Sequence, residues 1–437
     1  MSIQTIDEVI HAPLAVNGGQ PVRQRPLPHT WCGAQHMDEQ EVEAAMRVLR
    51  AKSPFRYYGP KLQNEAAKFE KEFAAYVGTE YALGVNSATG GLQVALGAAG
   101  VGPGDEVIIP CYFWVLTVAA VVRSGAIPVL ADCDDSFNMD PAAAERSITK
   151  RTKAILTVHM AGVMGHITEL VQVARRHKLT LIEDCAQAAG ISQNGRKAGS
   201  FGDIAVFSFQ MNKHMTTGEG GMVVTSNRRL YRRAAAIHDL GYPREEGDLA
   251  TREGDEAVQL WGIGVRMSEL TAAVGRVQLS KLDKICTCMR TAKYRIRAAL
   301  AEFGRIRLRE VIDPAGDGGS FLYLTFPARE ESLTVARAMT AEGVPVKPLD
   351  TFGMHIYYNV PSLVKKLGIS NKSVWDLVEN KDSRVSYDKG TCPHLDDLIN
   401  RTLYMNIPSG LITEDVADIC LAFRKVCTQV LEDGRPC

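Results

Sequence analysis

The sequence of 437 residues lacks an excess of charge of either sign, because 50 lysines and arginines balance 50 aspartates and glutamates. A balanced chain has no overall basic field, which argues against nucleic acid or an anionic membrane as its partner. Also lacking are an apolar run long enough to cross a bilayer and a basic-then-apolar pattern at residues 1–8. We therefore expect a cytoplasmic enzyme that acts on small molecules and touches neither nucleic acid nor membrane.

Cysteines at metal-binding spacing are lacking too. The ten cysteines are scattered, none forms a CxxC pair, and Cys286-Thr287-Cys288 is too tight for the usual zinc spacing. Most of them are predicted to be small buried hydrophobic residues in a reducing compartment. The sequence therefore predicts no metal site.

The length and the patterning indicate two lobes, because 437 residues exceed one ordinary core. Residues 1–27, rich in proline and glycine, are predicted to be an extended N-terminal arm. Residues 28–285 are predicted to form a large α/β domain and residues 286–437 a smaller α+β domain. Within the large domain, short apolar runs alternate with helical patterns, which is typical of βαβ units. The strands are expected at 81–85, 107–110, 127–132, 154–159, 179–184, 204–207 and 222–225.

Polar residues follow several of these apolar runs directly. In mostly parallel sheets, ligands bind at the carboxyl ends of the strands. The residues placed there are Asn86 to Gly91, Trp114, His159, Asp184 and Ser208. The coincidence of several independent positions predicts a binding site at that edge of the sheet.

Lys213 lies between the last two predicted strands, beside a glycine cluster at 218–221. A lysine held there is partly desolvated, and burial lowers the pKa of a lysine toward that of a nucleophilic free amine. Such an amine forms Schiff bases with carbonyls, including the aldehyde of pyridoxal phosphate (PLP). Most lysines between strands are simply solvated, so this interpretation depends on supporting residues elsewhere.

Pyridoxal chemistry needs further supports, and the chain offers a residue for each. A carboxylate must keep the ring nitrogen protonated, and Asp184 ends an apolar strand, although such aspartates more often cap helices. The phosphate needs a helix N-terminus and hydroxyls, which 87–91 and Ser208 could supply. Trp114 is suited to stack on the ring, although most tryptophans only fill a core.

Several separated motifs resemble the DegT/DnrJ/StrS family of PLP-dependent sugar aminotransferases. They are Arg56-Tyr57-Tyr58-Gly59, Asn86-Ser87-Ala88-Thr89-Gly90-Gly91-Leu92, Glu183-Asp184-Cys185-Ala186-Gln187-Ala188, Phe207-Ser208-Phe209 with Lys213, Thr217-Gly218-Glu219-Gly220-Gly221 and Arg266-Met267-Ser268-Glu269-Leu270. The resemblance implies a fold-type-I PLP-dependent transferase: a large, mostly parallel sheet domain, a smaller α+β C-terminal domain, and a homodimer.

The resemblance also implies roles for single residues. Lys213 would be the Schiff-base lysine and proton shuttle, and Asp184 the partner of the pyridine nitrogen. Gln187 would lie beside the cofactor's 3-hydroxyl, and Trp114 would stack on the ring. The phosphate contacts would be Thr89, Gly90 and Ser208, and the residues assigned to substrate binding are Tyr58, His159 and His355.

The implied function is an aminotransferase that moves an amino group from glutamate or glutamine to a keto-sugar or ketocyclitol, in amino-sugar or antibiotic biosynthesis. Two alternatives stay open. One is a sugar dehydratase of the same family, in which histidine usually replaces the lysine; Lys213 argues against it, and His214 keeps it open. The other is a catalytically silent homologue that binds the cofactor for regulation.

One departure from the family pattern concerns cofactor binding. The family usually has Gly-aromatic-Asn-x-Arg where this chain has 262–266, with Gly264 at the asparagine position. That asparagine commonly reaches the phosphate of the neighbouring subunit's cofactor. We therefore expect looser cofactor retention than in relatives, unless another residue such as Arg266 supplies the contact.

Overall fold

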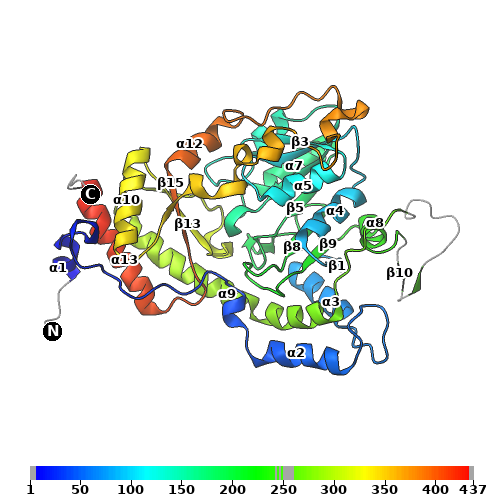
Figure 1. Cartoon of the computed structure of the whole chain (residues 1–437), viewed down its shortest axis with the longest axis horizontal. Helices are drawn as coiled ribbons and strands as arrows, with labels where there is room; N and C mark the ends of the chain where they lie inside the picture. The colour runs from blue at the N-terminus through cyan, green and yellow to red at the C-terminus, as the bar shows by residue number, and fades with distance from the viewer. Residues whose placement is uncertain (1–5, 242–243, 246–247, 250–259, 433–437) are drawn as a thin grey trace.

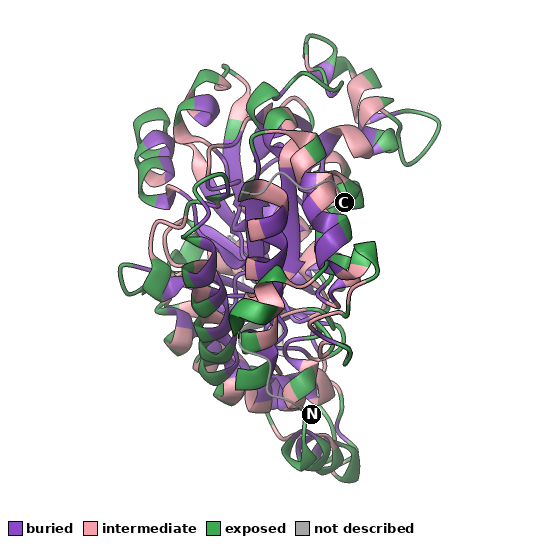
Figure 2. Cartoon of the chain, turned by 90° about the vertical axis from the view of Figure 1, so that its left-hand side faces the viewer, coloured by how far each residue is buried: buried purple, intermediate pink, exposed green. Residues whose placement is uncertain are grey.

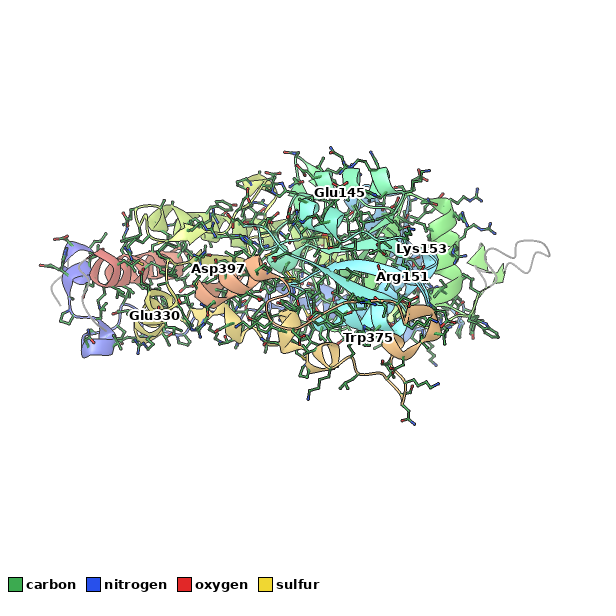
Figure 3. The ribbon with its side chains drawn as sticks, turned by 90° about the horizontal axis from the view of Figure 1, so that it is seen from above. Glu145, Arg151, Lys153, Glu330, Trp375 and Asp397 are labelled. Atoms are coloured by element: carbon green, nitrogen blue, oxygen red, sulfur yellow. The ribbon has the colours of Figure 1, made fainter. Side chains whose placement is uncertain are left out.

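The computed structural model describes residues 6–241, 244–245, 248–249 and 260–432, which form two main β-sheets surrounded by helices (Figure 1). The molecule is elongated when it is seen from above (Figure 3). Glu330 and Asp397 lie toward the end that contains the smaller sheet, and Arg151 and Lys153 lie toward the other end.

The larger sheet runs, within the described residues, in the order β1-β9-β8-β5-β4-β2-β3. All neighbouring strands are parallel except that β9 is antiparallel to both β1 and β8. The strands are β1 (Tyr81–Val85), β2 (Glu106–Pro110), β3 (Ile127–Ala131), β4 (Thr152–Val158), β5 (Thr180–Asp184), β8 (Ile204–Ser208) and β9 (Gly221–Thr225). They coincide with the predicted runs to within two residues at either end, and the predicted fold class is confirmed.

Helices cover both faces of this sheet, because successive side chains of a buried strand point to opposite sides. Val107 and Ile109 of β2 join one core cluster, whereas Ile108 between them joins the other. Figure 2 shows the strands as a buried layer between helices whose outer sides are exposed. The first cluster lies under α4 (Ala88–Ala98), α5 (Val115–Arg123) and α8 (Arg228–His238); the second lies under α3 (Glu65–Val77), α6 (Pro141–Arg146), α7 (Ile167–His177) and the start of α9 (Glu269–Leu300).

The smaller sheet is antiparallel and has the order β12-β13-β15-β14. Its strands are β12 (Arg307–Leu308), β13 (Phe321–Thr325), β14 (Lys347–Pro348) and β15 (Thr402–Asn406), and its core includes residues of α9, α10 (Arg329–Ala341) and α13 (Thr413–Cys427). Helix α9 is 32 residues long and contributes to the cores of both sheets. The division at residue 285 stays a prediction, and this position lies within α9.

The N-terminal segment lies against the helices of the smaller sheet (Figure 1). It contains the short helix α1 (Ile6–His11) and the single turn Ala15–Asn17. Arg23, which is buried, forms ion pairs with Asp415 at 2.7 Å and Asp418 at 2.8 Å. Residues 6–27 thus pack against other parts of the same chain. Whether they form a separate arm stays a prediction.

The segment from 349 to 401 crosses from the smaller sheet to the ends of β2 and β3. It contains α11 (Pro361–Val364) and α12 (Pro393–Arg401). None of the helices in the described part of the chain is both long and apolar enough to span a membrane. The remaining helices and strands are α2 (Glu39–Arg50), β6 (Ser192–Gln193), β7 (Arg196–Lys197), β10 (Arg244–Glu245) and β11 (Asp248–Leu249).

Candidate active site

A cavity of about 370 Å³ opens at the carboxyl ends of the central strands. Strands β4, β5 and β8 each end at its wall, and the loops that follow β1 and β2 complete it. This is the edge at which a mostly parallel sheet binds ligands. The cavity is lined by Ser87, Ala88, Thr89, Leu92, Trp114, Leu116, Thr117, Val158, Asp184, Ala186, Gln187, Ser208, Gln210, Asn212, Lys213, Glu219 and His355.

One end of the cavity is the N-terminus of α4. Ser87 caps this helix, and its Oγ accepts a hydrogen bond from the backbone N–H of Gly90 at 3.1 Å. The hydroxyl-bearing residues Thr89 and Ser208 line the same cavity. Backbone N–H groups at a helix N-terminus, combined with hydroxyls, are a suitable environment for a phosphate.

Asp184 stands in the same cavity and is 3% exposed. Its Oδ1 accepts from the backbone N–H of Ala186 at 3.0 Å, and its Oδ2 accepts from the hydroxyl of Thr117 at 2.9 Å. Burial raises the pKa of Asp184, while these two hydrogen bonds and the charge of Lys213 act in the opposite direction. Sequence reasoning missed Thr117, whose only signal is its place on the helix that follows the Trp114 loop.

Lys213 lies on the loop between β8 and β9, as predicted. Burial lowers the pKa of its amine, and the carboxylates of Asp184 and Glu219 partly offset that effect. An amine with a lowered pKa is uncharged, and therefore nucleophilic, in a larger fraction of molecules at neutral pH. Sequence reasoning had not singled out Glu219 as a neighbour of this lysine.

Aromatic and amide side chains form the remaining walls. The rings of Trp114 and His355 lie 4.7 Å apart, and burial lowers the pKa of His355 to about 4, so this imidazole is neutral at neutral pH. The Oε1 atom of Gln187 accepts from the backbone N–H of Ala161 at 2.8 Å. Because that oxygen is occupied, the NH₂ group of Gln187 remains to donate to a ligand.

Three of the predicted site residues do not line the cavity. Gly90 lies behind it, and its N–H is bonded to Ser87. His159 is 1% exposed, and its Nε2 lies 2.9 Å from Glu183 Oε2. Tyr58 is 69% exposed and lies outside the cavity in this single chain. In this chain, therefore, these three residues do not line the cavity in which a ligand would bind.

A second cavity of about 350 Å³ adjoins the first. Gln187, Asn212, Lys213 and His355 line both cavities, so the amine of Lys213 belongs to the wall between them. Three further groups of residues line the second cavity: Thr30, Trp31 and Cys32 near the N-terminus, His214 beside Lys213, and Ser320, Phe321, Phe352, Asn406 and Ile407 in the smaller sheet and its connections.

His214 is held away from the first cavity. Its Nδ1 bonds the carbonyl oxygen of Ala189 at 2.8 Å, and its Nε2 bonds the hydroxyl of Ser320 at 3.1 Å. Burial lowers its pKa, so the ring is neutral. Both ring nitrogens are occupied, and His214 therefore does not take the place of Lys213.

Residues 35–424 match the model of the DegT/DnrJ/EryC1/StrS aminotransferase family. The chain belongs to this family. The predicted family and the predicted aminotransferase activity are thereby confirmed.

Several named proteins are similar to this DegT-family aminotransferase. It is 34% identical over 430 residues to L-glutamine:2-deoxy-scyllo-inosose aminotransferase of Streptomyces fradiae, covering 95% of this chain and 97% of that one. It is 41% identical over 222 residues to GDP-perosamine synthase of Caulobacter vibrioides, covering 50% and 57%. The crystal structure of 3-amino-5-hydroxybenzoic acid synthase superposes with a TM-score of 0.76 at 26% identity, covering 94% of this chain and 100% of that chain.

Proposed function

We propose that this aminotransferase uses PLP to move the amino group of glutamine to a ketocyclitol, in antibiotic biosynthesis. The observation that carries the proposal is a single cavity that contains Lys213, Asp184 and the N-terminus of α4. The three groups are the amine, the carboxylate and the anion site that PLP requires. The long alignment with the Streptomyces fradiae enzyme supports glutamine as donor and a ketocyclitol as acceptor.

The residues present fit the cofactor. The phosphate would be held by the α4 N-terminus with Thr89 and Ser208, and the pyridine nitrogen by Asp184. Trp114 would cover one face of the ring, and Lys213 would hold the cofactor covalently. When it is bound, PLP supplies an electron sink that stabilises negative charge at the α-carbon of the amino donor.

The chain's own residues carry the protons. Lys213 Nζ, with its lowered pKa, accepts a proton from the α-carbon of the amino donor. It gives a proton back when the amino group passes to the acceptor. Thr117 donates to Asp184 and thereby keeps the buried carboxylate oriented and charged. His355 is neutral and lies on the wall shared by both cavities, where it can hydrogen-bond a hydroxyl of the acceptor.

The second cavity supports a compact acceptor. Its volume of about 350 Å³ accommodates one six-membered polyol ring, and Ser320, Asn212 and Asn406 offer hydrogen bonds to ring hydroxyls. The long alignment with the Streptomyces fradiae enzyme favours a free ketocyclitol over a nucleotide-linked keto-sugar.

We infer that the active unit is a cytoplasmic homodimer. Val42, Met46 and Leu49 lie on one side of α2 and are 52%, 37% and 52% exposed, while Ala44 and Val48 face the core. Trp261 is 95% exposed. Exposed apolar side chains such as the three on one side of α2 favour burial against another subunit. Sedimentation of the purified protein, compared with a Leu49→Glu variant, tests this inference.

Two measurements test the proposed function. Borohydride reduction of the purified holoenzyme followed by peptide mass spectrometry should place the pyridoxyl group on Lys213. Incubation with ¹⁵N-amide and ¹⁵N-amine glutamine should then transfer the α-amino nitrogen to 2-deoxy-scyllo-inosose faster than to a nucleotide-linked keto-sugar. An adduct on another residue, or a preference for the nucleotide-linked acceptor, would contradict the proposal.

A further inference from the structure

One large apolar side chain at the second cavity is open to solvent. Trp31 lines this cavity together with Lys213, and it is 44% exposed. Its indole stacks on the ring of His29, with the centroids 5.1 Å and the planes 11° apart. His29 is itself exposed, and the stack occupies only one face of the indole. A side chain of this size would stabilise the fold more if it were buried, so its place at the cavity indicates a contact with a ligand.

The backbone next to Trp31 is held at the loop that carries Lys213. The N–H of Gly33 donates to the carbonyl oxygen of Lys213 at 3.0 Å, and the carbonyl oxygen of Cys32 accepts from the hydroxyl of Ser409 at 2.9 Å. A Cβ atom at residue 33 would come within 2.8 Å of the backbone two residues after Lys213. Only glycine permits so close an approach. The position of Trp31 relative to the reactive amine is therefore set by the fold.

A second aromatic group lines the same cavity from another part of the chain. Phe321 of β13 and Phe352 have their ring centroids 6.1 Å apart, and Phe352 stacks on His355 at 4.1 Å with the planes 21° apart. Ser320 and Asn406 add polar groups to this cavity. Aromatic surface combined with a few polar groups is the usual lining of a site for a small organic molecule.

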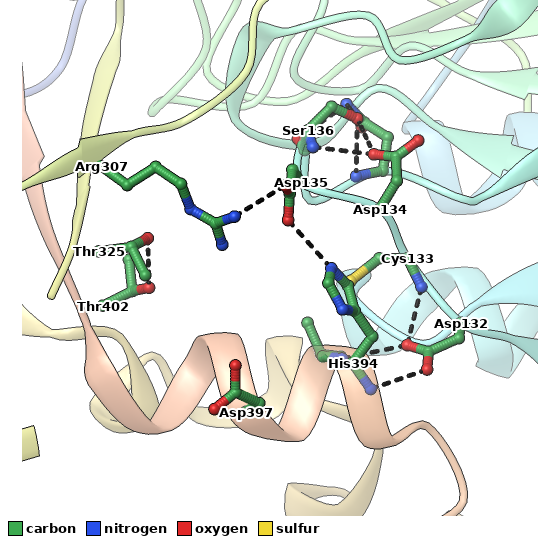
Figure 4. A network of polar contacts seen from close by, with 12 residues as sticks. Asp132, Cys133, Asp134, Asp135, Ser136, Arg307, Thr325, His394, Asp397 and Thr402 are labelled. Carbon is green, nitrogen blue, oxygen red and sulfur yellow. Dashed lines mark hydrogen bonds and ion pairs between the residues drawn. The ribbon is translucent and has the colours of Figure 1, made fainter. Parts of the chain in front are cut away.

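The segment that carries Phe352 is anchored at its far end by a polar network (Figure 4). Asp132 accepts from two backbone N–H groups at the start of α12, at 2.9 and 3.1 Å. Asp135 pairs with Arg307 at 2.8 Å and with the ring of His394 at 3.1 Å. These bonds join the loop after β3 to α12 and β12. Both carboxylates are bonded within the chain, so this network supports the wall of the cavity and does not itself form a ligand site.

A cyclitol and an amino acid present different surfaces to an indole. A six-membered ring that carries equatorial hydroxyls has C–H bonds on both of its faces, and such a face packs flat against an aromatic ring. Glutamine has only a short chain of methylene groups between polar ends. Both reactants must reach Lys213, but the indole gains more contact with the cyclitol.

We propose that Trp31 is a specificity-determining residue for the acceptor, whose indole covers one face of the ketocyclitol ring while Ser320 and Asn406 bind ring hydroxyls. This inference rests on the proposed function, because it concerns the acceptor named there. The indole carries no titratable proton, so Trp31 acts on the binding of the acceptor and leaves the transfer of protons to Lys213.

The two half-reactions of the holoenzyme, measured separately, test the proposal. With glutamine alone, Trp31→Ala should convert the cofactor to its amino form at a rate within about threefold of the wild type. With the amino form and 2-deoxy-scyllo-inosose, the acceptor concentration that gives half the maximal rate should rise by about tenfold or more, with the maximal rate little changed. Titration of the holoenzyme with this acceptor in the absence of donor should show the same loss of affinity without turnover.

Two further variants serve as controls. Trp31→Phe keeps a flat aromatic face and should restore most of the acceptor affinity. Val16→Ala shortens an apolar side chain of similar exposure, 41%, in the same N-terminal segment but outside both cavities, and should leave both half-reactions unchanged. Sedimentation of each variant shows whether its assembly differs from that of the wild type.

The outcomes separate this inference from the proposed function. A wild-type enzyme that transfers no amino group to 2-deoxy-scyllo-inosose would overturn both. If the wild type makes the transfer and Trp31→Ala keeps its acceptor affinity, the proposed function stands and Trp31 has no part in specificity. Equal losses in the two half-reactions, or a change of assembly in both Trp31 variants, would give Trp31 a structural role and overturn the inference alone.

Discussion

The two cavities that share Lys213 differ in how the sequence encodes them. Around the first cavity, Asp184 and Ser208 end apolar strands, and Lys213 lies on the loop that follows β8. The second cavity is lined by residues that are distant from Lys213 in the sequence, such as Thr30 and Asn406. The comparison teaches that a strand-end rule finds polar groups within one unit of the sheet. It overlooks the part of a site that other segments complete.

The largest effect is expected when Lys213 is replaced. Lys213→Ala removes both the covalent attachment and the proton carrier, so we expect kcat to fall by at least roughly 10³-fold. The measurement is steady-state transfer from glutamine. Lys197→Ala, whose amine pairs with Asp283 at 3.3 Å outside the cavity, serves as control and should retain activity. Comparable activity in the two variants would remove Lys213 from the chemistry.

Thr117 tests whether the hydrogen bond to Asp184 matters as much as the carboxylate itself. Thr117→Val removes a hydroxyl donor to a buried charge, which costs about 1.5–3 kcal/mol and corresponds to roughly 10–100-fold in cofactor affinity or kcat. Thr117→Ser keeps the hydroxyl and should restore most of the loss. Equal defects in both variants would mean that the methyl group's packing, rather than the hydrogen bond, is what the site needs.

Gly264 tests the departure from the family pattern. It is exposed, has φ +67°, and a Cβ atom there would meet nothing within 4 Å, so asparagine, which tolerates this conformation, fits. Arg266, the residue that could have replaced the missing contact, is paired with Asp239. Gly264→Asn should therefore tighten PLP binding by about tenfold. An unchanged dissociation constant in a cofactor titration would contradict the expectation of loose retention.

The smallest effect is expected at Glu219. Its negative charge raises the pKa of Lys213, so Glu219→Gln should lower that pKa further and make the free amine available at lower pH. Because Glu219 is solvent-exposed, we expect a shift below about one pH unit. The pH dependence of Lys213 labelling by an amine-reactive probe in the apoenzyme measures it. Glu330→Gln, at the far end of the molecule (Figure 3), should leave the labelling curve unchanged.

Sequence patterning predicted the larger sheet well because its strands are continuous apolar runs separated by clear helices. It did not find α12, β15 or α13. The apolar residues of α12 belong to the core under α4 and α5, whereas β15 and α13 pack on β13 and α9 in the core of the smaller sheet. These packing partners are distant in the sequence. The same limit applies to Thr117 and Glu219, whose importance comes from the neighbours that the fold gives them.

His159 and Tyr58 show a second limit. A histidine that follows a strand has the signature of a ligand contact, but here the fold turns its ring toward Glu183 below the surface. Tyr58 belongs to a family motif, but its side chain lies exposed on the surface of this chain. Position in the sequence thus identified the correct edge of the sheet, but it did not predict the direction of each side chain.

Helix α9 sets how the active site can admit its reactants. Its 32 residues span roughly 48 Å without interruption. An unbroken helix shared by two cores provides no hinge between them, so the two sheets keep a fixed spacing during turnover. Room for a donor and then an acceptor must therefore come from local displacement of the loops at 210–220 and 349–360, and deuterium exchange should concentrate there while α9 stays protected.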